Sequence, residues 1–297
     1  ADVRAWVTQL QALPSPRGGT LTGSTLRQHL YALSNLYRRA QGEGYVPPGF
    51  NPVSALMEKP TAEREEARWL EVHEAALLLE AARVLPLRRP DLAAAFMYPL
   101  VATFLLTGGR KAEVLGLQVA DVSFDRKTVT FRKNATRRLK TRPSHRTIPL
   151  WPQLEEILRP YVFQADRPPS ELLFPRIEAG QERMVTDFRK ALNRVTVPAG
   201  WGEGAITPKM FRHTYCAARL QTLDRGAPVS PYTVSREMGH GSQDMVERVY
   251  SHLGQVRHRS EVVEYRIEQH GEVLAERLER LRAPFVTTFV TTPAKLG

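Results

Sequence analysis

Three side chains at the start of one predicted helix have the types and spacing to bind an anion. The stretch ITPKMFRHTYCAARL predicts a helix, because Thr207 can cap its start and Pro208 suits the first helical position. Lys209, Arg212 and His213 follow at spacings of three and four, which place them on one face. A helix start carries partial positive charge, so cations there are unfavourable unless an anion binds. We therefore expect this face to meet an anion.

Arg110 is a second candidate for anion binding. It follows DLAAAFMYPLVATFLLTGG, an almost wholly apolar stretch that predicts a buried helix ending in a Gly-Gly break. A guanidinium held rigidly on an apolar support can donate paired hydrogen bonds to a planar or tetrahedral anion. The alternative is an ordinary surface arginine that opens the next short helix, KAEVLGL.

A basic run extends from Arg126 to Arg146. It contains nine Lys and Arg residues and no acid, and it covers two predicted strands and the turn between them. Most charge runs are solvated faces, but cations gathered on a hairpin suit contact with a phosphate backbone. Lys140 lies near the end of the turn, where a flexible amine could reach a scissile bond. The candidate phosphate contacts in this run are Arg132, Lys133, Arg137, Arg138 and Arg142.

His240 and Tyr250 lie in the segment EMGHGSQDMVERVYSHL, and either one in isolation is more often structural than catalytic. The eight histidines are scattered, with no Cys partner and no H-E-x-x-H spacing, so the pattern does not predict a metal site. The sequence also contains no G-x-S-x-G, P-loop or G-x-G-x-x-G motif. What remains is a set of cations, one histidine and one tyrosine.

Composition restricts the class of binding partner and the cellular compartment of the protein. The 297 residues include 42 Lys and Arg against 31 Asp and Glu, a net charge of +11 that favours nucleic acid over a membrane surface as partner. The single cysteine, Cys216, excludes a disulfide framework within one chain and fits a reducing cytoplasm. No apolar run reaches the roughly 20 residues that span a bilayer. We expect a soluble, cytoplasmic protein.

The elements that must position these side chains divide into a small helical region and a larger mixed one. We expect a helical domain, a linker, a second domain, and a C-terminal helix with a tail, at 1–60, 61–67, 68–258 and 259–297. Three alternating, β-branched strands fit LQVADVSF, KTVTFRK and HRTIPL. Helices are predicted at 152–163, 185–196, 208–223, 230–238 and 243–253.

Taken in order, these segments resemble the tyrosine recombinase (phage integrase) family over about 68–260. TGGR followed by KAEVLGL is similar to the family's first-arginine box, and LKTRPSHRTIPL is similar to its hairpin-lysine segment. TPKMFRHTYCA looks like the second-arginine box, and MGHGSQDMVERVYSHL looks like the final box with the nucleophile. Two features depart from the common pattern: Lys209 stands where many members have His, and the gap from His240 to Tyr250 is one residue longer.

The resemblance implies a metal-independent enzyme that needs no cofactor. The implied fold is mainly α with a small antiparallel β-sheet, built from a helical core-binding domain and an α+β catalytic domain. The implied activity is site-specific DNA recombination through a 3′-phosphotyrosyl bond, carried out by a tetramer assembled on double-stranded DNA. In this activity Tyr250 is the nucleophile and Lys140 the general acid to the leaving 5′ oxygen. The implied catalytic residues are Arg110, Lys140, Lys209, Arg212, His240 and Tyr250.

Two alternatives stay open within this resemblance. Type IB topoisomerases share the catalytic domain and relax DNA as monomers, and Lys209 slightly favours them because they typically use Lys at this position. A DNA-binding regulator on an inert copy of the fold is the other alternative, but an inert copy would be expected to lose at least one catalytic residue.

The segment 260–282 predicts an amphipathic helix with heptad-like spacing of its apolar residues. The stripe consists of Val263, Ile267, Leu274, Leu278 and Leu281. Such a stripe can fold back on its own domain or lie in a groove of a neighbouring copy. The preferred interpretation is docking in trans, which resembles the family's habit of donating a C-terminal segment to a neighbour.

Overall fold

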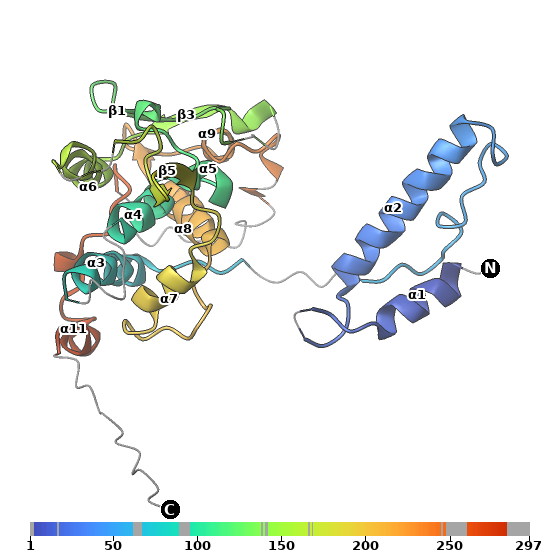
Figure 1. Ribbon diagram of the computed structural model, residues 1–297, viewed down its shortest axis with the longest axis horizontal. Helices are drawn as coiled ribbons and strands as arrows, with labels where there is room; N and C mark the ends of the chain where they lie inside the picture. The colour runs from blue at the N-terminus through green and yellow to red at the C-terminus, as the bar shows by residue number, and fades with distance from the viewer. Residues whose placement is uncertain are drawn as a thin grey trace, which may run out of the picture. The chain divides into compact units, whose positions relative to one another are not determined.

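The chain divides into two compact units, Ala1–Glu66 and Ala67–Gly297 (Figure 1). All the candidate site residues belong to the second unit. None of the helices in the described part of the chain is long and apolar enough to cross a membrane. The computed structural model describes residues 3–16, 18–61, 67–88, 96–137, 139, 142–165, 167, 169–244, 246–247 and 260–283.

The first unit is built on helices, as the sequence predicts. α1 (Val3–Ala12) precedes α2 (Gly23–Gly42), and the side chain of Thr22 caps the start of α2 by accepting a hydrogen bond from its first turn. Leu26 and Leu30 are buried on α2, whereas no side chain of α1 is buried. The apolar core of this unit is therefore small.

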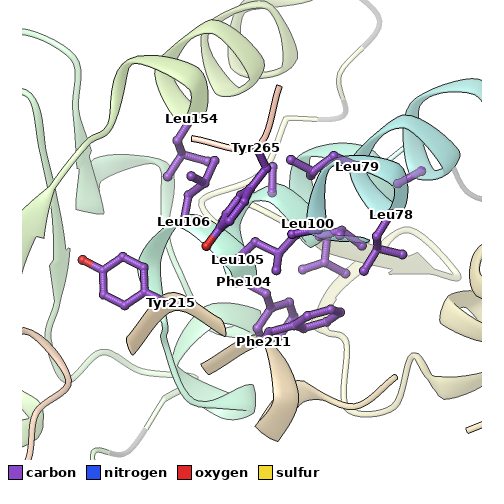
Figure 2. Close-up of a cluster of buried hydrophobic side chains, with 14 of the residues drawn as sticks. Leu78, Leu79, Leu100, Phe104, Leu105, Leu106, Leu154, Phe211, Tyr215 and Tyr265 are labelled. Carbon is purple, nitrogen blue, oxygen red and sulfur yellow. The ribbon is translucent and has the colours of Figure 1, made fainter. Parts of the chain in front are cut away.

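A cluster of apolar helices forms the core of the second unit. α4 (Met97–Thr107) packs against α3 (Val72–Arg88), α6 (Pro152–Phe163) and α8 (Pro208–Leu220). Ten residues of α4 are buried, so this helix is apolar on every side. Figure 2 shows its Phe104 beside Phe211 of α8, and its Leu106 beside Leu154 of α6. Cys216 of α8 is also buried.

Next to the helices lies a three-stranded antiparallel sheet. Its strands run in the order β1 (Val122–Ser123), β2 (Thr128–Phe131) and β3 (Arg146–Pro149). Phe131 at the end of β2 faces Arg146 at the start of β3, so the part of the basic run between these two residues is the loop of a strand-paired hairpin. This sheet and the helices agree with the predicted fold class of mainly α structure with a small antiparallel sheet.

The first strand is shorter than the predicted 117–124. Residues Val119–Asp121 form a 3-10 turn, η1, instead of extended backbone. The carboxylate of Asp121 accepts a hydrogen bond from the backbone N–H of Gln118 at 3.0 Å, which favours the turn over a longer strand.

Two further hairpins were not predicted. They are β4 (Pro175–Glu178) with β5 (Gln181–Met184), and β6 (Leu223–Asp224) with β7 (Ala227–Pro228). Both turns begin with a non-glycine residue at positive φ and continue with glycine, namely Ala179–Gly180 and Arg225–Gly226. The usual hairpin signal has Asn or Asp in the first turn position, and this sequence lacks it.

Most of the later helices lie close to their predicted bounds. α6 coincides with the predicted 152–163, and α8 ends three residues before the predicted 223. α7 (Arg189–Thr196) starts four residues after the predicted 185, and α9 (Pro231–Glu237) fills nearly all of its predicted range. The predicted helix at 243–253 lies mostly outside the described residues.

The prediction of one continuous helix over 260–282 is wrong. This segment contains a 3-10 turn, η3 (Ile267–His270), and a separate helix, α11 (Ala275–Arg282). Four of the five stripe residues are buried in the core of the second unit, namely Val263, Leu274, Leu278 and Leu281. In the single chain the stripe folds back on its own domain. Docking on a neighbouring copy stays a prediction. The tail at 284–297 lies outside the described residues.

Gly108 ends α4 in a left-handed conformation, with φ at 59°. A Cβ atom at this position would lie 2.5 Å from Cδ1 of Tyr215, whose ring is fully buried. We predict that Gly108→Ala lowers the free energy of unfolding by roughly 1–3 kcal/mol, through backbone strain and overpacking. Urea unfolding measures the change. Gly202→Ala is the matched control, because no atom lies within 4 Å of its added Cβ; equal losses in both variants would contradict the prediction.

Candidate active site

Arg110 is held from three sides. It is the N-cap of α5 (Lys111–Leu115), directly after the left-handed turn that ends α4. Its Nη1 donates to Oε1 of Glu113 at 2.8 Å and to Oγ of Ser144 at 3.2 Å, and its Nη2 donates to the carbonyl of Gly239 at 3.1 Å. Glu113 also accepts from the backbone N–H of Arg110 at 2.9 Å. The guanidinium is therefore fixed by hydrogen bonds on both of its Nη atoms, and the side chain is about 30% exposed.

Arg212 lies on α8, and its guanidinium reaches the same place. Its Nη1 donates to the carbonyl of Gly108 at 2.7 Å, and its Nη2 donates to the carbonyl of Met238. The same Nη2 lies 2.9 Å from Nε2 of His240, so that ring nitrogen is placed to accept from it. The structure thus brings Arg110, Arg212 and His240 together from three separate parts of the sequence.

Four consecutive residues, Glu237 to His240, hold the cationic groups. The carbonyl of Glu237 accepts from Nε of Arg146, that of Met238 accepts from Arg212, and that of Gly239 accepts from Arg110. The segment begins at the last residue of α9. Carbonyl groups at a helix end have no acceptor role within the helix, so they are available to other donors. One short stretch of backbone therefore sets the positions of three guanidinium groups.

Cations dominate the electrostatics of this site. Burial lowers the pKa of Arg212 to about 9, and the charges of Arg110 and Arg146 act in the same direction. Burial and then the charges of Arg212, Arg110 and Arg146 lower the pKa of His240 to about 4. Burial alone would raise the pKa of Glu113, but Arg146 and then Arg110 lower it to about 2. Cations crowded in this way are stabilised by a bound anion.

The start of α8 has the cap that the sequence predicts. The hydroxyl of Thr207 accepts from the backbone N–H of Met210, and Pro208 is the first helical residue. Lys209 lies on this first turn, and no hydrogen bond joins it to Arg110, Arg212 or His240 in the part of the chain that the structure describes. Burial and the charges of Lys209 and Arg212 lower the pKa of His213 to about 4.

The candidate phosphate contacts of the basic run differ in their exposure to solvent. Lys133 and Arg132 are both exposed, and Arg132 is bound to Asp121 at 2.6 Å. Arg137 is a correction to the sequence analysis: it is 1% exposed, and its guanidinium binds Asp121 at 3.1 Å and the carbonyl of Glu113 at 2.8 Å. A buried, bonded guanidinium is not available to DNA, so Arg137 supports the fold.

Several of the predicted residues cannot be placed in the site. Tyr250, Lys140 and Arg138 lie outside the described residues. Arg142 lies in the 3-10 turn η2 (Arg142–Ser144), and its side chain is not described. Among the residues that the structure describes, no group of three His, Cys, Asp or Glu side chains could hold a metal ion.

Sequence reasoning missed Glu113, Ser144 and the role of Arg146. A signal was present for Glu113, which stands three residues after the N-cap Arg110, where an acid commonly bonds back to the cap. Arg146 was counted only as the last cation of the basic run. Ser144 and the carbonyls of 237–239 have no sequence signal, because serine is common in turns and every residue has a carbonyl.

Comparisons with known proteins agree with this architecture. The model of the phage integrase family matches residues 68–256, well over half of the chain. The search of curated proteins returned no match. The Tn1549 transposon integrase in complex with transposon right end DNA is 18% identical, with a TM-score of 0.60, over 92% of this chain and 84% of that one. The XerH site-specific recombinase in a post-cleavage complex with palindromic difH substrate is also 18% identical, with a TM-score of 0.61, over 86% and 70%.

Arg137 and Lys133 provide a test of which cations of the basic run support the fold. We predict that Arg137→Met lowers the free energy of unfolding by roughly 1–3 kcal/mol, because Asp121 keeps only Arg132 as its charged partner and the carbonyl of Glu113 loses a buried donor. Lys133→Met is the matched control; it should change stability by less than about 0.5 kcal/mol, as exposed substitutions usually do. Urea unfolding measures both. An Arg137→Met protein as stable as the Lys133→Met protein would restore Arg137 as an accessible cation.

His240 gives a test of the electrostatics. We predict that NMR titration of the free protein finds its pKa well below the ordinary value of about 6.5. Added inorganic phosphate should raise this pKa, because an anion offsets the charges of Arg212 and Arg110 that disfavour the imidazolium. Arg110→Ala removes one of those charges and should raise the pKa without phosphate. An ordinary pKa in the free wild-type protein would show that the cations do not converge on His240.

Proposed function

We propose that this chain, which belongs to the phage integrase family, is a site-specific DNA recombinase that cuts and rejoins DNA through Tyr250. The observation that carries the proposal is the convergence of Arg110, Arg212 and His240 on one segment of backbone. Their arrangement leaves positive charge uncompensated at a place where a phosphodiester can be bound.

The proposed chemistry is an exchange of one phosphate ester for another. The phenolic oxygen of Tyr250 attacks phosphorus, a bond from that oxygen to phosphorus forms, and the bond to the 5′ oxygen breaks. The result is a 3′-phosphotyrosyl link and a free 5′-hydroxyl, and the reverse reaction rejoins the strand. No net hydrolysis occurs, so the energy of the broken bond is kept for rejoining.

Each residue has a proposed role in this exchange. Arg110 and Arg212 bind the non-bridging oxygens and stabilise the negative charge of the pentacoordinate transition state. His240 hydrogen-bonds the phosphate, and Lys209 assists the phosphate contact or proton transfer. Lys140 gives its proton to the leaving 5′ oxygen, and the phenolic proton of Tyr250 is lost to solvent or a nearby base. The cations favour the phenolate, whose ordinary pKa is about 10.

The proposed partners are a double-stranded DNA recombination site and three further copies of the chain. The structurally similar Tn1549 integrase was solved with circular intermediate DNA and with transposon right end DNA, and XerH with difH substrate. A role in moving or resolving a DNA element, in the cytoplasm, is the corresponding proposal for this chain. The exposed Lys133 and Arg132, with Arg138 and Arg142, are the proposed contacts of the basic run with the DNA backbone.

Lys209 favours a second candidate, a topoisomerase that relaxes DNA as a monomer, because the related type IB enzymes typically have lysine at this position. The two candidates differ in assembly, since exchange between two sites needs several protomers on DNA whereas relaxation needs one. Native electrophoresis on site-bearing DNA separates them. A monomer that relaxes supercoils and never brings two sites together would favour the topoisomerase.

The covalent step gives the first test of the proposal. We predict that wild-type protein forms an adduct with candidate attachment-site DNA and that Tyr250→Phe abolishes it while DNA affinity stays nearly unchanged. The reason is that Phe retains the ring but lacks the nucleophilic oxygen. Denaturing electrophoresis detects the adduct and a filter-binding titration measures affinity. Persistence of the adduct in Tyr250→Phe would remove this residue as the nucleophile.

The leaving-group step gives the second test. We predict that Lys140→Ala slows cleavage of ordinary DNA by about 10²–10⁴-fold, the usual contribution of a general acid. DNA with sulfur in place of the bridging 5′ oxygen should be cleaved with little loss, because a thiolate leaves without a proton. Single-turnover rates on both substrates make the comparison. Lys127→Ala is the control from the same basic run, because Lys127 is bound to Glu155 and is not a proposed DNA contact; it should cleave both substrates at the wild-type rate. Equal slowing of Lys140→Ala on both substrates would argue against the general-acid role and make Lys133 the next candidate.

A further inference from the structure

We propose that Arg146 is a positioning residue for Arg110: it holds every group that fixes the Arg110 guanidinium and does not itself contact the substrate. The phosphate-binding part of this inference stands on the contacts below, and its extension to DNA cleavage rests on the proposed function. Arg146 is the first residue of β3, and its side chain is buried between the sheet and the end of α9.

The Arg146 guanidinium is buried and bonded through all three of its nitrogen atoms. Its Nε donates to the carbonyl of Glu237, its Nη1 donates to the carbonyl of Ser144 at 2.9 Å, and its Nη2 donates to Oε2 of Glu113 at 2.9 Å. Its carbon Cζ lies 4.2 Å from the centre of the Phe131 ring. The side chain is about 5% exposed, so Arg146 cannot bind a phosphate as Arg110 and Arg212 are placed to do.

Each partner of Arg110 is also in contact with Arg146. Glu113 accepts a hydrogen bond from Arg110 on one carboxylate oxygen and from Arg146 on the other. Ser144 accepts a hydrogen bond from Arg110 on its hydroxyl and from Arg146 on its carbonyl. Gly239, whose carbonyl is the third partner, packs directly on Arg146, because a Cβ there would lie 3.1 Å from Nη1. Loss of the Arg146 contacts therefore loosens all three supports at once.

The charge of Arg146 adds to this geometry. A buried carboxylate would ordinarily tend to take up a proton, and Arg146 is the largest influence that keeps Glu113 ionised. An ionised Glu113 can accept hydrogen bonds from both guanidinium groups and from the backbone of Arg110. Arg146 thus maintains both the position and the charge state of the group that Arg110 needs.

A merely structural arginine would stabilise the domain without affecting Arg110. The energetic coupling between substitutions at positions 146 and 110, measured with a double-mutant cycle, separates the two roles. The test uses the full chain as wild type, Arg146→Lys, Arg110→Ala and the double variant, titrated with inorganic phosphate by NMR. Arg146→Lys keeps the charge, and so favours folding, but one amine cannot replace three directed donors. We expect it to weaken phosphate binding by roughly 10- to 100-fold, as loss of a supporting contact does at other preorganised sites.

The same substitution should weaken binding by less than about twofold when Arg110 is already alanine, because the supported group is then absent. Equal losses in both backgrounds, or no loss in either, would overturn the proposal. The NMR signals of the Arg110 Nη atoms give an independent readout. We expect restricted rotation of the Arg110 guanidinium in the wild type and free rotation in Arg146→Lys. Unchanged rotation of this group would also overturn the proposal.

Arg219→Lys is the matched control. Arg219 is a buried arginine of the same unit, paired with the carboxylate of Glu237 at 2.8 Å, and it contacts none of the three partners of Arg110 among the described residues. It should lose stability while keeping phosphate affinity and Arg110 rotation. A matching loss of phosphate affinity in Arg219→Lys would make the effect a general result of loosening the core and count against Arg146.

The outcomes for the site and for the reaction are distinct. If the wild-type protein binds phosphate with the expected coupling but forms no adduct with DNA, the recombinase proposal fails and the role of Arg146 stands. If the wild-type protein binds no phosphate, Arg110 and Arg146 do not support an oxyanion site, and this inference fails. On cleavable DNA, the rate loss of Arg146→Lys should likewise vanish in the Arg110→Ala background.

Discussion

Three successive carbonyl groups at the end of α9 each accept a hydrogen bond from a different arginine side chain. A carboxylate in the same place would hold a guanidinium more strongly, but it would also cancel the charge. A carbonyl is a neutral dipole, so it fixes the direction of Arg212 and leaves its charge available. Arg110 is also bound to the carboxylate of Glu113, but Arg146 shares that single negative charge, so the three arginines keep a net positive charge. The depressed pKa values of Arg212 and His240 express this uncompensated charge. The candidate site depends on this choice of acceptor.

The parts of the fold that follow from local chemistry could be predicted from the sequence. The cap of α8 needs only Thr207 and Pro208, and the pairing of β2 with β3 needs only alternating apolar residues around a polar turn. The continuous helix over 260–282 was wrong because periodic leucines do not reveal where a chain changes direction. The buried segment around Val263 satisfies the core with irregular backbone instead.

The site itself was only half visible in the sequence. Arg110, Arg212 and His240 have distinctive side chains and local contexts, and the structure brings them together. The acceptors that orient them are mostly backbone atoms, which every residue type provides. Arg137 shows the opposite error, because it looks like its neighbours in the basic run and differs from them only through burial beside Asp121. Burial of that kind arises from tertiary packing and leaves no local pattern.

α8 is attached to the end of α9 at two points. Arg212 binds the carbonyl of Met238, and Arg219, two turns later on the same face, binds the carboxylate of Glu237. The hydroxyl of Tyr215 adds a third bond to that carboxylate at 3.1 Å. The end of α9 is therefore joined to α8 by bonds outside the candidate site as well as by Arg212.

Cys216 lies on α8 between these two attachments, one turn after Arg212, and it is the single cysteine of the chain. Its thiol is buried in the core of the second unit. A thiol reagent can modify it only when this part of the core opens, so the rate of labelling reports how often that opening occurs. Labelling of Cys216 therefore reports local opening beside the candidate site without an engineered probe.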